Sequence, residues 1–207
     1  SHLSVKPDSV GPSFPITFLL LALATGLTNG VGVMASQFFG AKNADAFRKN
    51  LSTACFTLLG AGILITILGV LTSRPLLAGL LQADASILDD ALLYLRIYCI
   101  GLVFQFAYNT FAAILRSIGD SRSTMYFLLI ATVVNIVLDL IFVQFWQVAG
   151  VAWATVIAQA VSAITAGIYL FRKVELAKFH KGQFRFHKEM FTMSLRLGVP
   201  TSIQQCS

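Results

Sequence analysis

The chain has 207 residues, of which 57% are hydrophobic and 12% are charged, and its mean hydropathy is +0.78. A soluble globular domain carries about 25% charged residues, so the composition excludes that class and indicates a membrane protein. The net charge of +6 comes from short basic clusters between apolar runs, which argues against nucleic acid as a partner.

Five apolar runs are each long enough to cross a bilayer, which takes about 20 helical residues. They occupy residues 14–39, 51–73, 91–115, 124–146 and 151–171, after a polar lead-in at residues 1–13. The connection at residues 144–150 is too short for anything but a hairpin, so the last two runs should pack antiparallel. The sequence therefore predicts an all-α, polytopic membrane helix bundle. Residues 14–171 would form five transmembrane helices, residues 172–189 a basic cytoplasmic loop and residues 190–207 the start of the next helix.

The first run has a small and polar centre. Gly26 and Gly30 stand in the GxxxG spacing that permits close approach of two helices, so tight packing is the favoured interpretation. The alternative is a helix that lines an aqueous cavity through Thr28 and Asn29.

Most lysines and arginines fall in alternate connections between the runs. They are Lys42, Arg48, Lys49, Arg116, Arg122, Arg172, Lys173, Lys178, Lys181, Arg185 and Lys188. Because basic loops of membrane proteins stay in the cytoplasm, these connections are predicted to be cytoplasmic. We expect a multi-pass protein of the inner (plasma) membrane, surrounded by the lipid bilayer.

The run at residues 124–146 carries one carboxylate, Asp139. A charge at the bilayer centre costs at least about 2.5–3.5 kcal/mol, so an acid in this place normally faces a cavity or a partner. Asn135 lies one helical turn before Asp139 on the same face, and Thr132 lies one turn before that. These three polar residues on one face of an otherwise apolar helix make Asp139 the leading candidate for a functional group.

Thr155, on the following run, lies at a similar depth. At a rise of about 1.5 Å per residue, Asp139 is roughly 10 Å and Thr155 roughly 8 Å below the hairpin end of the pair. The two side chains can therefore meet. Oxygen ligands suit a hard cation such as Na+, and a buried carboxyl group can also take up a proton, so this group of residues suits either ion.

Signals for other chemistry are weak. The cysteines lack CxxC spacing, and the histidines lack the spacing of a zinc site. No nucleophile, base and orienting group converge at one depth. We expect no enzyme, no cofactor and no metal ion other than Na+ at Asp139.

Several short stretches together resemble the multidrug and toxic compound extrusion (MATE) transporters. They are QFFGAK at residues 37–42, RSIGDSR at residues 116–122, NIVLD at residues 135–139, GVAWAT at residues 150–155 and LGVP at residues 197–200. The resemblance runs over residues 14–207 and corresponds to helices two to six of the family's amino-terminal lobe and the start of helix seven.

The resemblance implies half of a twelve-helix antiporter that exports cationic, amphipathic drugs in exchange for Na+ or H+. Asn135, Asp139 and Thr155 match three positions of the family's cation site. The helix-one aspartate of that site has no counterpart, so the first helix and the carboxy-terminal lobe are expected as missing partners. Recognition of varied drug cations favours a broad cavity with aromatic and methionine side chains. The candidate lining residues are Thr28, Asn29, Met34, Tyr108 and Asn109.

Two other functions stay open. One is a flippase for lipid-linked oligosaccharides from the same superfamily, which more than twelve spans or a basic cavity would favour. The other is a non-transporting membrane module in which Asp139 only hydrogen-bonds to neighbouring helices.

Overall fold

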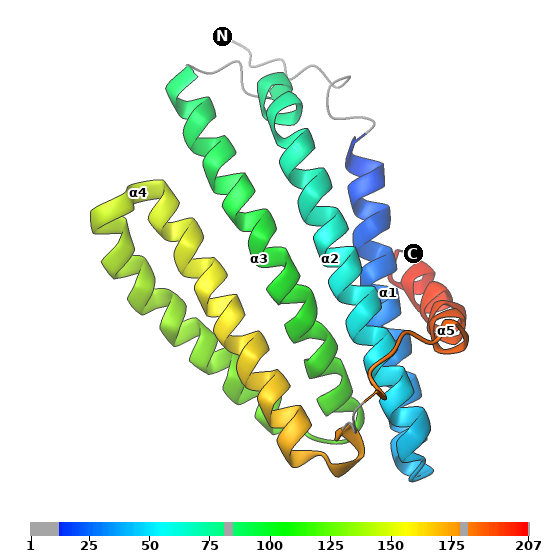
Figure 1. Ribbon diagram of the computed structural model, residues 1–207. Coiled ribbons are helices and arrows are strands. Elements are labelled where there is room, and N and C mark those ends of the chain that lie inside the picture. Colours follow the sequence, from blue (N-terminus) through cyan, green and yellow to red (C-terminus); the bar gives the residue numbers. More distant parts are fainter. Residues whose placement is uncertain (1–12, 81–84, 179–181, 207) are drawn as a thin grey trace.

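The structure is a computed structural model that describes residues 13–80, 85–178 and 182–206. Its elements are α1 (Ser13–Gly40), α2 (Ala44–Leu80), α3 (Ala85–Ser117), α4 (Ser121–Lys173), a short 3-10 helix η2 (Glu175–Ala177) and α5 (Lys188–Cys206). No strand occurs in these residues, so the predicted all-α class is confirmed (Figure 1). Helix α3 packs against α1, α2 and α4, while α5 packs mainly against α1.

Helix α4 is a hairpin of two antiparallel halves. The chain reverses at Gln147, whose φ of 47° and ψ of −120° are not helical. Gly150 lies directly against the carbonyl group of Phe142, so a Cβ at this position would collide with the first half. The predicted hairpin is confirmed, and it sets the two halves of α4 side by side (Figure 1).

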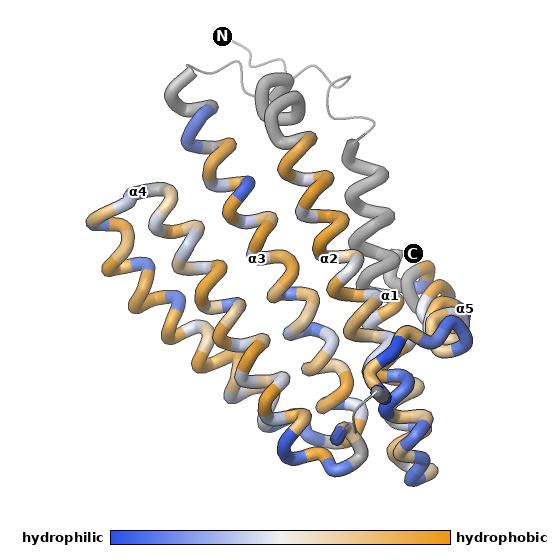
Figure 2. Tube along the Cα trace, in the orientation of Figure 1, coloured by the Kyte–Doolittle hydropathy of each residue, from blue (hydrophilic) through white to orange (hydrophobic). Residues whose placement is uncertain are grey.

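Four helical segments of the described residues are long and apolar enough to cross a membrane. They are Ala44–Leu71, Leu92–Ser117, Ser121–Gln147 and Ala149–Lys173. Figure 2 shows apolar residues along the middle of these helices and hydrophilic residues gathered at the end where α1 meets α2 and α3 meets α4. The basic connections thus share one end of the bundle, as the alternation of charge predicts.

Helix α2 is longer at both ends than the apolar run at residues 51–73. Helix α2 begins at Ala44, seven residues before the expected apolar run, because Asn43 caps it through a 3.1 Å bond from the amide of Ala46. A 2.9 Å ion pair between Asp45 and Lys49 supports the first turns. At its other end α2 continues to Leu80. The apolar runs therefore mark the membrane-crossing part of the helices and not their full length.

Close packing of α1 on α5 explains the glycines of the first run. A Cβ on Gly30 would collide with the carbonyl oxygen of Ser194, and a Cβ on Gly198 would collide with that of Gly26. Gly26, Gly30 and Gly198 thus let two backbones meet without side chains between them. Of the two interpretations of this run, the structure shows the packing role.

Candidate functional site: a polar cluster inside the α4 hairpin

The hairpin brings together the three residues of the predicted cation site. Asn135 and Asp139 lie one turn apart on the first half of α4, and Thr155 lies on the second half. With its nitrogen toward the acid, the Asn135 amide donates to Oδ2 of Asp139 at 3.2 Å, and its oxygen accepts from the backbone N–H of Thr155 at 3.3 Å. One side chain thus connects the acid to the neighbouring half of the hairpin.

The Asn135 amide could also lie the other way round, with its nitrogen 3.4 Å from Oγ1 of Thr155. That orientation would set the amide oxygen against the Asp139 carboxylate, and two acceptors repel each other. The first orientation satisfies both ends of the amide and is therefore the favoured one.

The other oxygen of Asp139, Oδ1, is buried and has no hydrogen-bond partner in the described part of the chain. Buried polar oxygens are almost always paired, because an unpaired one costs about 1–3 kcal/mol. The Thr155 hydroxyl donates to the carbonyl of Val151 at 3.2 Å, so the lone pairs of its oxygen can still face a ligand. The Asp139 carboxylate and the Thr155 hydroxyl oxygen fit a hard cation. The same carboxylate fits a proton.

Two further polar side chains lie in this part of the bundle, and one of them, Gln159, was not expected from the sequence. Gln159 is one turn after Thr155, and its Oε1 is buried without a partner among the described residues. The side chain passes close to α3, because a Cβ on Gly101 would lie 2.6 Å from that oxygen. On α3, Oε1 of Gln105 is also buried and has no hydrogen-bond partner among the described residues. Four-residue spacing from Thr155 was the signal that could have indicated Gln159.

The candidate drug-contacting residues are spread over α1 and α3. Met34 is completely buried and accepts a 3.4 Å hydrogen bond from the Ser194 hydroxyl of α5. Tyr108 donates to the backbone carbonyl of Thr124 at 2.9 Å and ties α3 to the start of α4. Both side chains therefore have a structural role.

For the other three candidate lining residues, the structure gives the degree of burial. Thr28 is buried, while Asn29 and Asn109 are half-buried. Their part in a cavity stays a prediction.

Asp120 closes the opposite end of the hairpin. Its Oδ1 accepts from the backbone N–H of Ser123 at 3.1 Å and caps α4, while its Oδ2 accepts from the hydroxyl of Tyr169 at 2.8 Å. Gly119, with a φ of 92°, makes the turn into this cap. Partial burial would raise the pKa of Asp120, but the hydrogen bonds from Tyr169 and Ser123 outweigh it and leave the pKa below its ordinary value.

Fold and site together define a multi-pass α-helical membrane protein whose polar, acid-containing cluster lies inside a helical hairpin. A model of the MatE family matches residues 8–141, and the chain belongs to that family. This confirms the resemblance drawn from the short motifs. Because the relatives are transporters, it also supports the prediction that the chain is not an enzyme.

Relatives and solved structures agree with this assignment. The chain is 31% identical over 205 residues to "Probable multidrug resistance protein YoeA" of Bacillus subtilis (strain 168), covering 94% of this chain and 44% of that protein. It is 28% identical to "Multidrug export protein MepA" of Staphylococcus saprophyticus, covering 93% of this chain and 43% of that protein.

Two solved structures of a multidrug resistance MATE family transporter of the MOP superfamily match the fold. The inward-facing one has a TM-score of 0.79 at 27% identity, covering 95% of this chain and 45% of that chain. The outward-facing one has a TM-score of 0.78 at 26% identity, covering 98% of this chain and 46% of that chain. The chain thus spans a little under half the length of the proteins that it matches.

Proposed function

We propose that this chain is part of a secondary transporter that exports cationic, amphipathic drugs in exchange for Na+ or H+, with Asp139 as the coupling acid. The observation that carries the proposal is the Asn135–Asp139–Thr155 cluster, in which one buried carboxylate oxygen has no partner among the described residues. A cation or a proton at that oxygen would neutralise the charge inside the bundle. Binding would then lower the energy of the conformation in which the acid is enclosed.

The proposal assigns different roles to the three residues. Asp139 supplies the charge. Asn135 holds one carboxylate oxygen and presents its own oxygen to the second half of the hairpin. Thr155 contributes a hydroxyl oxygen from that half, so an ion would bridge the two halves of α4.

Similarity to two conformations supports a rigid role for this region. The chain matches the inward-facing and outward-facing structures almost equally, with TM-scores of 0.79 and 0.78. Equal similarity is expected if access alternates by movement of one part of a transporter against another, while each part keeps its own packing. The first helix and the carboxy-terminal lobe would be the moving counterparts.

Drug recognition would use a broad cavity rather than one fixed anchor. Single substitutions of Tyr108 or Met34 should then change the range of exported drugs modestly and leave export in place. If either substitution abolished export of every drug in a folded, inserted protein, the broad cavity would be wrong.

The test uses the full-length transporter that contains this chain, reconstituted in proteoliposomes. Accumulation of a cationic drug is measured with a Na+ gradient alone, with a pH gradient alone and without any gradient. Uphill transport driven by one gradient supports the proposal and identifies the coupling ion. Transport that never exceeds the gradient-free level would leave the non-transporting module or the flippase as the better assignment.

A further inference from the structure

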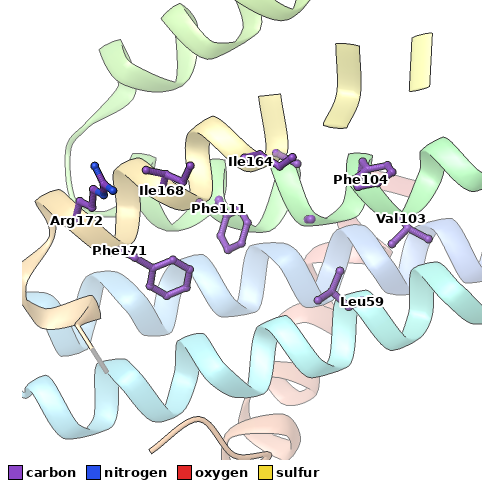
Figure 3. Close-up of a pocket in the computed structure, with 11 residues that line it drawn as sticks. Leu59, Val103, Phe104, Phe111, Ile164, Ile168, Phe171 and Arg172 are labelled. Atoms are coloured by element: carbon purple, nitrogen blue, oxygen red, sulfur yellow. The ribbon is translucent and has the colours of Figure 1, made fainter. Parts of the chain in front are cut away.

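A groove of about 510 Å³ lies between α2, α3 and the second half of α4, away from the polar cluster. Its walls are apolar: Leu59 of α2, Val103 and Phe111 of α3, and Ile164 and Ile168 of α4. Phe104 and Val103 lie at one end of the groove and Phe171 and Arg172 at the other (Figure 3). The groove is therefore an apolar channel with one cationic end.

The groove lies on the opposite face of the second half of α4 from the polar cluster. At 3.6 residues per turn, Ile164 and Ile168 lie about 180° and 220° around the helix from Thr155 of the polar cluster. Their exposed fractions are 57% and 49%, so no described part of the chain covers this side of the membrane-crossing segment.

A glycine makes room for the groove. A Cβ on Gly167 would lie 3.1 Å from the ring of Phe111, so the ring rests almost on the backbone of α4. Phe111 in turn meets Phe171 edge to face, with ring centroids 6.1 Å apart. These two rings form part of the groove wall on the side of Arg172.

Charge and length both indicate the occupant. Arg172 is exposed and forms no ion pair with any residue that the structure describes. From Ala163 to Arg172 the groove follows about 13 Å of helix, close to one leaflet of a hydrocarbon core about 30 Å thick. Arg172 also lies at the end of the bundle that the basic connections mark as cytoplasmic, where lipid headgroups are most often anionic.

We propose that this groove binds one anionic phospholipid of the inner leaflet, with an acyl chain between α3 and α4 and the phosphate at Arg172. Guanidinium groups bind phosphate through paired hydrogen bonds, and the apolar walls offer the chain fixed side chains in place of moving lipid tails. The site is independent of ion coupling, because its lining and the polar cluster lie on opposite faces of α4.

The test measures lipid binding to the full-length transporter by native mass spectrometry. The purified protein is titrated with phosphatidylglycerol and with phosphatidylcholine of the same acyl chains. Wild type should prefer phosphatidylglycerol. Arg172→Gln should reduce that preference about fivefold, which is the effect of one basic side chain at an anionic lipid surface. Arg172→Lys keeps the charge and should keep most of the preference.

Neighbouring residues provide matched controls. Lys173→Gln removes an equal charge one residue further on, outside the groove, and should leave the preference unchanged. Ala107→Trp fills the groove and should weaken the binding of both lipids, whereas Val133→Trp introduces the same side chain at an exposed position of the first half of α4 and should not.

Three results would overturn the proposal: no preference in wild type, equal losses in Arg172→Gln and Lys173→Gln, or unchanged binding in Ala107→Trp. Melting temperature and a monodisperse elution profile show that each variant is folded.

Discussion

Replacing Asp139 with Asn separates the charge of the polar cluster from its shape. The amide has nearly the same size, and its oxygen can still accept the 3.2 Å hydrogen bond from Asn135. What disappears is the negative charge and the ability to bind a proton. A carrier driven by either ion should therefore lose uphill export, so that drug accumulation falls to the level seen without a gradient.

Stability should move in the opposite direction. A charged aspartate at the bilayer centre opposes insertion by about 2.5–3.5 kcal/mol, and the neutral amide removes most of that penalty. Expression and melting temperature of Asp139→Asn should therefore equal or exceed those of wild type. Loss of export together with an unchanged melting temperature indicates a coupling role. Replacing a purely structural acid with Asn would reduce neither export nor the melting temperature.

Variants of the two neighbours give the size of their contributions. A hydrogen bond to a charged group contributes about 1.5–3 kcal/mol, and 1.4 kcal/mol corresponds to a factor of ten in affinity. If Na+ is the coupling ion, Asn135→Ala should raise the half-saturating Na+ concentration about tenfold or more. Thr155→Ala, which removes one hydroxyl ligand, should raise it by about fivefold. Both variants should keep the maximal rate close to that of wild type.

The assay is gradient-driven efflux in proteoliposomes, with the three variants and wild type at equal protein density. Wild-type efflux by Asp139→Asn would remove Asp139 from the mechanism and leave only the family membership behind the transporter assignment.

Other predictions concern topology, packing and pH. A cysteine at Asn43 should be labelled only from the cytoplasm and one at Ala85 only from outside; labelling of both from one face would refute the orientation. Gly30→Ala should destabilise the protein by about 1–3 kcal/mol, because its Cβ would collide with α5, whereas Gly60→Ala has open space and should be neutral or stabilising in thermal unfolding. Because the pKa of Asp120 is lowered in the folded protein, its carboxylate stabilises the fold above the ordinary aspartate pKa, and that stabilisation is lost as the pH falls through the lowered value. The wild-type melting temperature should therefore fall more steeply with acid than that of Asp120→Asn, and parallel curves would contradict this.

The sequence predicts the hairpin and the meeting of Asn135, Asp139 and Thr155 because both depend on distance along the chain. Residues 144–150 are too few for any connection but a reversal, and depth follows from the rise per residue. The end of the second expected run, at residue 73, lies close to the end of the membrane-crossing segment at Leu71, but the helix itself continues to Leu80. Apolar runs report the thickness of the membrane, whereas caps and ion pairs decide where a helix ends.

Rotation of each helix about its axis was harder to predict. In a soluble helix the apolar face indicates the core, but a membrane helix is apolar on most faces and gives no such signal. The unpaired oxygen of Gln159 and its approach to Gly101 therefore emerged only from the structure. The bond between Asp120 and Tyr169 joins residues 49 positions apart, and no local pattern indicates it.

The contacts at the two ends of the hairpin explain how the polar cluster is held in place. At one end, Gly150 against the carbonyl of Phe142 fixes the distance between the halves of α4. At the other end, the hydroxyl of Tyr169 on Asp120 fixes their relative height, since a shift of one residue would move the donor by about 1.5 Å. With distance and height both fixed, the 3.3 Å contact between the Asn135 amide and the Thr155 backbone follows from the hairpin itself. The cluster can thus keep its geometry if another part of the protein moves against the hairpin, which is what the proposed ion site would require of it.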